Sequence, residues 1–317
     1  MLQVSDLVTE FAVRAGVVHA VNGVSFEVGD GQLVGLVGES GCGKSASVRS
    51  IMGLVHPPGR VVDGSVRLNG RELLGLSRRE LRTIRGAEIG FVGQNPFAAL
   101  NPVLKIEAQF KNMARAHGRY AAAEVRERAH AKLTAVQMPG VERVLRGYAH
   151  ELSGGMAQRV VIALATLLDP ELLIADEPTT ALDVTVQREI LETLRELVVR
   201  EGRSMLLVTH DLGVVAQYCD SVVVMYAGRV VERGPVRTVF RSPAHPYTQA
   251  LLEAVPRAGK PLRQLRGSLP DPLDYPPGCP YAARCPRAAA PCATIFPEPR
   301  PTERGSDVSC HFPLEGA

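Results

Sequence analysis

The chain has 317 residues, of which 45% are hydrophobic, which is enough to bury the core of one large domain or of a core with additions. Its 36 basic and 33 acidic residues give a net charge of +3, and the scattered basic residues lack the stripe typical of nucleic-acid-binding proteins. No apolar run approaches the roughly 20 residues that span a bilayer, and the N-terminus has no signal-peptide pattern, so we expect a globular, cytoplasmic protein whose six cysteines are mostly reduced.

Short β-branched runs alternate with helical stretches in two parts of the chain, residues 1 to about 95 and about 155 to 240. Strands are predicted at residues 32–37, 89–93, 172–176, 205–209 and 221–226. This alternation is typical of an α/β fold with a mostly parallel sheet.

The sequence GESGCGKS at residues 38–45 fits the phosphate-binding pattern G-x-x-x-x-G-K-[ST], between an apolar run and a helical stretch. Glycines let backbone N–H groups surround a phosphate, Lys44 neutralises its oxygens, and the Ser45 hydroxyl can bind Mg²⁺. Lys44 is the only lysine in the first hundred residues, which argues against an ordinary glycine-rich turn. The predicted phosphate site consists of Gly38, Glu39, Ser40, Gly41, Cys42, Gly43, Lys44 and Ser45.

Residues 98–150 are rich in Ala, Arg and Glu, contain no convincing strand, and include an amphipathic helix at 121–136. The corner Ser153-Gly154-Gly155 follows, directly before a predicted helix at 156–168. Ser153 can act as the N-cap of that helix, and its first turn offers N–H groups to an anion. We therefore predict a second phosphate-binding corner at these three residues.

The predicted strand at 172–176 ends in Asp176, followed by Glu177. One carboxylate can hold Mg²⁺ and the next can polarise an attacking water, although an apolar strand with a solvated acidic end is a common alternative. A later strand is followed by His210, at the strand end where ligands gather in open α/β sheets.

Composition divides the chain into three domains. We expect a phosphate-binding α/β core at 1–97 and 156–255, a helical subdomain at 98–155, and a C-terminal extension at 256–317. The extension holds 13 of the 23 prolines and four of the six cysteines, so it cannot be regular structure throughout.

Taken together, these motifs resemble the ATPase subunit of ABC transporters over residues 1 to about 255. Residues 38–45 match the Walker A loop, Gln94 the Q-loop, 152–156 the signature, 172–177 Walker B, 181–183 (from Ala181 to Asp183) the D-loop, and His210 the switch histidine. The resemblance implies an α/β P-loop NTPase core with a mostly parallel sheet and antiparallel N-terminal strands, a helical signature subdomain, and an irregular tail.

The same resemblance implies that two such subunits pack head to tail, with each ATP between the Walker A loop of one and the signature of the other. Ser153, Gly154 and Gly155 would then bind the partner's ATP, with Asp183 nearby. Glu177 would be the general base, and His210 would hold the γ-phosphate. Gln94 would bind Mg²⁺ with Ser45 and Asp176 and would link the site to the membrane subunit. Phe11 would stack on adenine, or it is an ordinary strand aromatic.

Met156 in the signature, NPFAALNPV after Gln94 and SPAHPYTQALLEAVP near residue 250 resemble the oligopeptide/dipeptide permease branch, which also contains nickel importers. We therefore expect the motor of a peptide importer at the cytoplasmic face of the membrane. Its partners would be a second ATPase subunit, more often homologous than identical, two permease subunits and, indirectly, an extracytoplasmic solute-binding protein, but no nucleic acid. The alternatives are a nickel or other small-solute importer and a soluble ABC-type ATPase.

Four cysteines in the extension follow the spacing C-x₅-C-x₆-C-x₁₇-C, at Cys279, Cys285, Cys292 and Cys310. Disulfides do not suit a reducing compartment, and the extension offers little core for structural thiols. Zinc usually takes C-x₂₋₄-C pairs, which are absent here. The spacing and the resemblance together favour a [4Fe–4S] cluster that braces the tail, with zinc or no metal as alternatives. Nothing in the sequence places this cluster beside the ATP site.

Overall fold

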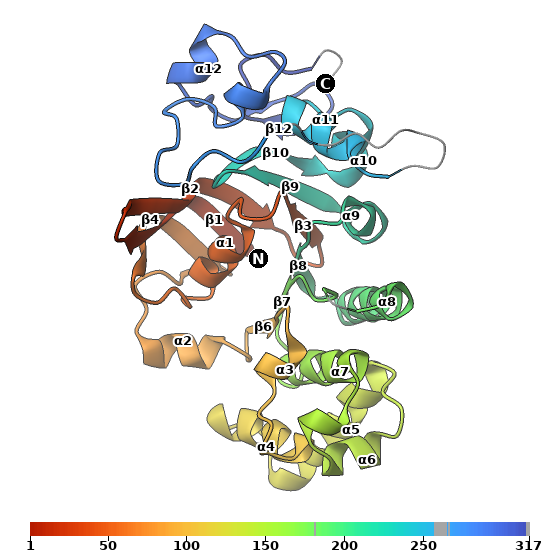
Figure 1. Cartoon of the computed structure of the whole chain (residues 1–317). Helices are drawn as coiled ribbons and strands as arrows, with labels where there is room; N and C mark the ends of the chain where they lie inside the picture. Colours follow the sequence, from red (N-terminus) through yellow and green to blue (C-terminus); the bar gives the residue numbers. More distant parts are fainter. Residues whose placement is uncertain (181, 257–264, 266, 315–317) are drawn as a thin grey trace. The chain divides into compact units, whose positions relative to one another are not determined.

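The computed structural model describes residues 1–180, 182–256, 265 and 267–314, and the chain divides into two compact units (Figure 1). The first unit consists of Met1–Val28, Gln32–Gly75 and Leu207–Ala317, and the second of Gly29–Gly31 and Leu76–Leu206. In the part of the chain that the structure describes, no helix has the length and apolarity needed to cross a membrane.

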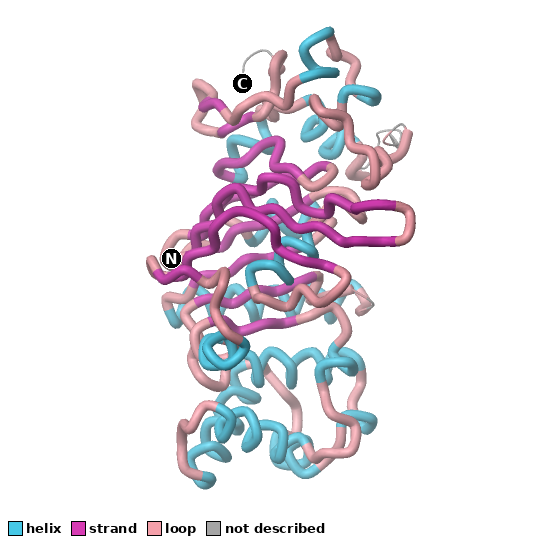
Figure 2. The backbone as a smooth tube through the Cα atoms, turned by 90° about the vertical axis from the view of Figure 1, so that its left-hand side faces the viewer, coloured by secondary structure: helices cyan, strands magenta, loops and turns pink. Residues whose placement is uncertain are grey.

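One sheet of the first unit is antiparallel and runs in the order β2-β1-β4-β5. Its strands are β1 (Leu2–Val13), β2 (Gly16–Val28), β4 (Gly59–Leu68) and β5 (Arg71–Glu72), and Figure 2 draws the strands as magenta tubes. Leu2 and Val4 of β1 are buried while the residues after them are exposed, which is the period-two pattern of a strand with one face on the core. This sheet supplies the antiparallel N-terminal strands that the resemblance implies.

The other sheet portion of the first unit runs in the order β11-β12-β10-β9-β3. Its strands are β3 (Leu33–Val37), β9 (Ser221–Tyr226), β10 (Arg229–Pro235), β11 (Arg300–Pro301) and β12 (Asp307–Val308). Strands β3 and β9 are parallel, whereas β10, β12 and β11 continue the sheet antiparallel. Every residue of β3 is buried, as expected for a strand covered on both faces.

The helices of the first unit are α1 (Lys44–Ile51), α9 (Leu212–Tyr218), α10 (Val236–Arg241), α11 (Pro246–Glu253) and α12 (Ala290–Thr294), with a 3₁₀ turn η2 (Ala282–Arg284). The C-terminal extension packs on the core here, and Cys279 and Cys292 are each only 8% exposed. They share a cluster with Tyr226, Tyr247 and Tyr281. The expectation that the extension has little core is therefore wrong, because it shares the core of β9, β10 and α11.

The second unit contains parallel strands β6 (Ile89–Val92) and β7 (Leu172–Asp176), with β8 (Ser204–Val208) next to β7 and reaching the unit boundary. Its helices are α2 (Arg78–Ile84), α3 (Pro96–Ala99), α4 (Ile106–Ala116), α5 (Ala122–Ala135), α6 (Val141–Arg146), α7 (Gly154–Ala165) and α8 (Val184–Glu201), with a 3₁₀ turn η1 (Ala149–Glu151). All five predicted strands are present within one residue at each end. The expected α/β fold with a mostly parallel sheet is confirmed.

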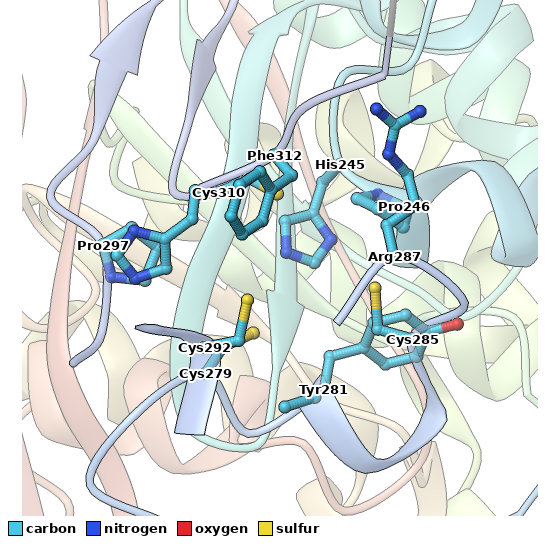
Figure 3. A pocket seen from close by; sticks show the side chains of 12 residues that line it. His245, Pro246, Cys279, Tyr281, Cys285, Arg287, Cys292, Pro297, Cys310 and Phe312 are labelled. Carbon is cyan, nitrogen blue, oxygen red and sulfur yellow. The ribbon is translucent and has the colours of Figure 1, made fainter. Parts of the chain in front are cut away.

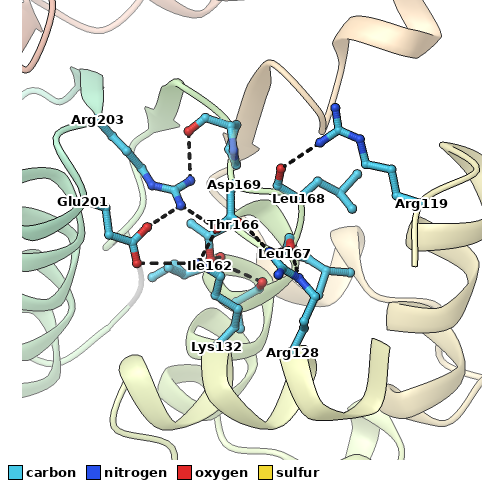
Figure 4. Close-up of polar contacts among 12 residues, drawn as sticks. Arg119, Arg128, Lys132, Ile162, Thr166, Leu167, Leu168, Asp169, Glu201 and Arg203 are labelled. Atoms are coloured by element: carbon cyan, nitrogen blue, oxygen red, sulfur yellow. Dashed lines mark hydrogen bonds and ion pairs between the residues drawn. The ribbon is translucent and has the colours of Figure 1, made fainter. Parts of the chain in front are cut away.

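A charged network in the second unit centres on Asp169, which follows α7 with φ 56° (Figure 4). Its Oδ1 accepts from Lys132 Nζ and Arg203 Nη2, each at 2.7 Å, and its Oδ2 accepts from Arg128. Partial burial alone would raise the pKa of the Asp169 carboxyl, but the hydrogen bonds and charges of these partners lower it below its ordinary value. The network joins α5 to the ends of α7 and α8.

Candidate functional site

The predicted phosphate loop connects β3 to α1 and has a backbone that only glycine accepts at two positions. Gly38 has φ 154° and Gly43 has φ 107°. A Cβ at Gly38 would lie 2.2 Å from the carbonyl oxygen of Met225, and one at Gly43 would lie 2.3 Å from that of Ala20. Because both obstacles are backbone atoms, a side chain here would displace the loop.

Lys44 begins α1 and turns back over the loop that precedes it. Its side chain is buried, and Nζ donates to the carbonyl oxygens of Gly38 at 2.7 Å and Glu39 at 3.0 Å. The adjacent Cys42 is fully buried, and burial raises the pKa of its thiol. The loop therefore presents a cation and the positive end of a helix within one turn of chain, an arrangement that can bind a polyphosphate.

His210 and Phe11 also belong to the first unit. His210 is exposed and follows β8, and the next residue, Asp211, caps α9 by accepting from Gly213 N at 2.7 Å and Val214 N at 3.3 Å. Phe11 is half-buried, and a Cβ at Gly59 would lie 2.5 Å from its Cε1. The Phe11 ring thus lies over Gly59 on the adjacent strand.

Gln94 and Glu177 lie together in the second unit. Glu177 follows β7 with φ 49°, and its Oε2 accepts from Gln94 Nε2 at 3.2 Å and from Thr180 Oγ1 at 3.0 Å. Val92 of β6 pairs with Ala175 of β7, and this pairing explains the contact. Residues that directly follow two adjacent parallel strands lie at the same edge of the sheet. Two donors therefore orient this carboxylate.

Ser153 caps α7 as expected, and its Oγ accepts from Met156 N at 3.3 Å. A Cβ at Gly155 would lie 2.7 Å from Cγ1 of Val186, so α7 begins close against the first turn of α8. Asp183 caps α8, with Oδ1 accepting from Val186 N at 3.0 Å. The structure thus places the predicted signature and Asp183 side by side. Ala181 lies outside the described residues.

The four cysteines of the extension line one pocket with His245, Tyr281 and His311 (Figure 3). Burial raises the pKa of the Cys279 thiol to about 11 and also raises the pKa values of Cys285 and Cys310. Within residues 1–180, 182–256, 265 and 267–314, no group of three or more His, Cys, Asp or Glu side chains is arranged to hold a metal ion. The sulfurs therefore share a pocket without forming a compact mononuclear site.

His245 is a residue of this pocket that the sequence analysis did not identify. It is 1% exposed, its Nδ1 accepts from Tyr247 N at 3.0 Å, and burial lowers its pKa to about 3. The ring is therefore neutral, and with Nδ1 as an acceptor its proton lies on Nε2. Nε2 is buried and has no hydrogen-bond partner among the described residues. Figure 3 shows the ring turned into the pocket.

Arg284 is a second residue that the sequence analysis missed. Its Nη1 donates to both carboxylate oxygens of Glu39, at 3.0 and 3.1 Å, and to Tyr226 Oη at 3.1 Å. The expectation that nothing places the cysteine segment beside the phosphate loop is therefore corrected. No local pattern could have revealed a contact between residues 245 positions apart.

Comparison with known proteins agrees with these features. Residues 21–180 match the family described as ABC transporter, and residues 231–292 match the oligopeptide/dipeptide transporter, C-terminal region. The chain is 43% identical to the dipeptide transport ATP-binding protein DppD of Bacillus subtilis, over 98% of this chain and 94% of that protein. It is 46% identical to the oligopeptide transport ATP-binding protein OppD of Salmonella typhimurium, over 94% and 89%. The solved dimeric structure of MJ0796, a bacterial ABC transporter cassette, is 28% identical with a TM-score of 0.67, over 75% of this chain and 99% of that one.

Proposed function

This chain belongs to the family of ATP-binding subunits of oligopeptide and dipeptide ABC transporters, and we propose that it works as one half of a head-to-tail pair of such subunits. It hydrolyses ATP to ADP and phosphate, and this hydrolysis drives the import of oligopeptides or dipeptides. The observation that carries the proposed pairing is that one chain has two separate glycine-containing turns that lead into helices, residues 38–45 before α1 and Ser153–Gly155 at the start of α7, each suited to bind a phosphate.

The proposed assembly places the chain at the cytoplasmic face of the membrane as a peripheral subunit. Its partners are a second, homologous ATPase subunit, two permease subunits and, indirectly, an extracytoplasmic solute-binding protein. The division into a core at 1–97 and 156–255, a helical subdomain at 98–155 and an extension at 256–317 stays a prediction.

Residues 38–45 bind the phosphates of ATP in this proposal, with Phe11 against the adenine. The positive φ values of Gly38 and Gly43 and the buried Lys44 at the start of α1 support it, since a glycine-rich loop before a helix N-terminus can bind phosphate through its N–H groups. Ser45, Asp176 and Gln94 hold Mg²⁺, whose charge offsets that of the phosphates.

Glu177 is the proposed general base. The hydrogen bonds from Gln94 and Thr180 hold its carboxylate in one orientation, so that it accepts a proton from the attacking water. His210 holds the γ-phosphate of the same ATP. Ser153, Gly154, Gly155 and Asp183 serve the ATP of the partner subunit, and the exposure of Ser153 and Asp183 fits such a role.

We further propose that Cys279, Cys285, Cys292 and Cys310 hold a [4Fe–4S] cluster that braces the extension. Their shared pocket supports this ligand set. A tetrahedral zinc site would bring its sulfurs to about 3.8 Å from one another, because Zn–S distances are about 2.3 Å. The cysteine sulfurs that ligate a [4Fe–4S] cluster lie farther apart, because the cluster itself stands between them. The buried Nε2–H of His245 also fits, since a cluster sulfur would supply the acceptor that this donor lacks among the described residues.

The transport function is tested by reconstituting the chain with its permease, partner ATPase and binding protein in liposomes. ATP hydrolysis should rise when a dipeptide or short oligopeptide is supplied, and Lys44→Ala should abolish the rise. Stimulation by nickel ions but by no peptide would overturn the proposed solute.

The cluster is tested by purifying the chain without oxygen and measuring iron, sulfide, zinc and absorbance near about 400 nm. About four iron and four sulfide per chain support the proposal. Stoichiometric zinc, or a folded extension that contains no metal, would overturn it.

A further inference from the structure

The second residue of the phosphate loop is acidic and is paired with the cysteine segment. Glu39 receives two hydrogen bonds from one nitrogen of Arg284, at 3.0 and 3.1 Å. The Arg284 side chain is 6% exposed and that of Glu39 is 21% exposed, so water screens this ion pair weakly. Arg284 ends η2 and directly precedes Cys285.

A second contact also involves Glu39. Glu39 N donates to Tyr247 Oη at 3.0 Å. The Tyr247 ring packs against Tyr226 and against Tyr281, with ring centroids 4.6 and 5.4 Å away. Tyr281 lies in the cysteine segment, two residues after Cys279. This hydrogen bond therefore joins the loop to Tyr247 of α11, which packs against the cysteine segment, whereas the ion pair joins the loop to that segment directly.

Charge gives the ion pair a specific consequence for ATP. Glu39 carries a negative charge within the loop proposed to receive a polyphosphate, and like charges repel most strongly where water is excluded. Arg284 offsets this charge and prevents the Glu39 carboxylate from rotating freely. Without Arg284 the loop would present an unpaired carboxylate to ATP.

We propose that Arg284 is a positioning residue for ATP binding, which neutralises Glu39 and thereby makes the affinity of the phosphate loop depend on the folded cysteine segment. The proposal rests on ATP binding by residues 38–45, and it is independent of what the four cysteines bind. Disruption of the segment at Cys285 would displace the neighbouring Arg284 and thereby lower the affinity of the loop for ATP.

The test is a double-mutant cycle on the full chain, with Mg-ATP affinity measured by displacement of a fluorescent ATP analogue. Arg284→Gln should raise the Kd for ATP about tenfold, since it leaves a partly buried charge unpaired. Adding Glu39→Gln to that variant should restore the Kd to within about threefold of the wild type, because no unpaired carboxylate remains. Arg304→Gln is the control, because it removes an exposed cation of the same extension that does not line the cysteine pocket, and it should leave the Kd unchanged.

The double variant separates the effect of the Glu39 charge on the Kd from any effect of misfolding, because it also lacks Arg284. If its Kd stays as high as that of Arg284→Gln, or if Arg284→Gln binds ATP like the wild type, the proposal is wrong. Lys44→Ala distinguishes failure of this proposal from failure of the proposed ATP site. Normal ATP binding by Lys44→Ala would instead refute the assignment of residues 38–45 as the ATP site.

Discussion

Replacing Glu177 with Gln should separate ATP binding from ATP hydrolysis. In the structure, Oε2 of Glu177 accepts from Gln94 Nε2 and Thr180 Oγ1. A Gln amide oxygen at the same position accepts both bonds, so the local geometry is retained. Two hydrogen bonds to a charged acceptor become two to a neutral one, which costs at most about 1 kcal/mol each in the free energy of unfolding.

The cost in rate should be far larger than the cost in stability. An amide cannot accept the proton of the attacking water, and losing a general base lowers kcat about 10²- to 10⁴-fold. This corresponds to about 3–5 kcal/mol in the activation free energy. The Kd for ATP should change less than about threefold, because the phosphates are held by residues 38–45 in our proposal.

The assay is phosphate release by the assembled transporter at saturating ATP, with ATP binding and thermal melting measured on the same preparations. Glu171→Gln is the matched control, since Glu171 is an exposed carboxylate just before the other end of β7. Its turnover should equal that of the wild type. Phosphate release by Glu177→Gln within about threefold of the wild-type rate would refute the assignment of the base, since a missing base costs much more.

Three further predictions follow from other parts of the chain. Ser153→Arg should impair hydrolysis at the partner's site while this chain's own ATP affinity stays near normal, and a loss of affinity in the isolated chain as large as that of Lys44→Ala would contradict the head-to-tail pairing. Cys285→Ser should abolish the absorbance near about 400 nm that the proposed cluster would give to anaerobically purified protein and should expose the extension to protease, whereas unchanged absorbance and digestion would exclude Cys285 as a ligand. Asp169→Asn should lower the free energy of unfolding by about 1 kcal/mol at pH 7. Because the folded-state pKa of Asp169 is lowered, this stabilisation is present above its ordinary pKa of 3.8 and is lost as the pH falls through the folded-state value. The melting temperatures of wild type and variant should therefore converge in acid. A difference that stays constant with pH would refute the role of the Asp169 charge.

Local chemistry explains why much of this protein could be predicted from its sequence. The five strands were predictable because β-branched runs bounded by helical stretches favour buried strands. The loop between β3 and α1 was predictable because its glycines mark backbone conformations that other residues avoid, such as those of Gly38 and Gly43, whereas phosphate binding there stays a prediction. The start of α7 was predictable because the Ser153 hydroxyl satisfies an N–H three residues away. Each of these signals lies within one short segment.

Only the tertiary structure decided which distant side chains meet. Gln94 reaches Glu177 because β6 and β7 are parallel neighbours, and that pairing depends on how the sheet assembles. Arg284 reaches Glu39 across 245 residues because the extension packs into the core beside β9 and α11, which the proline-rich composition of the extension did not predict. A side-chain contact between distant segments depends on the packing of every element between them, so residue type and spacing alone do not predict it.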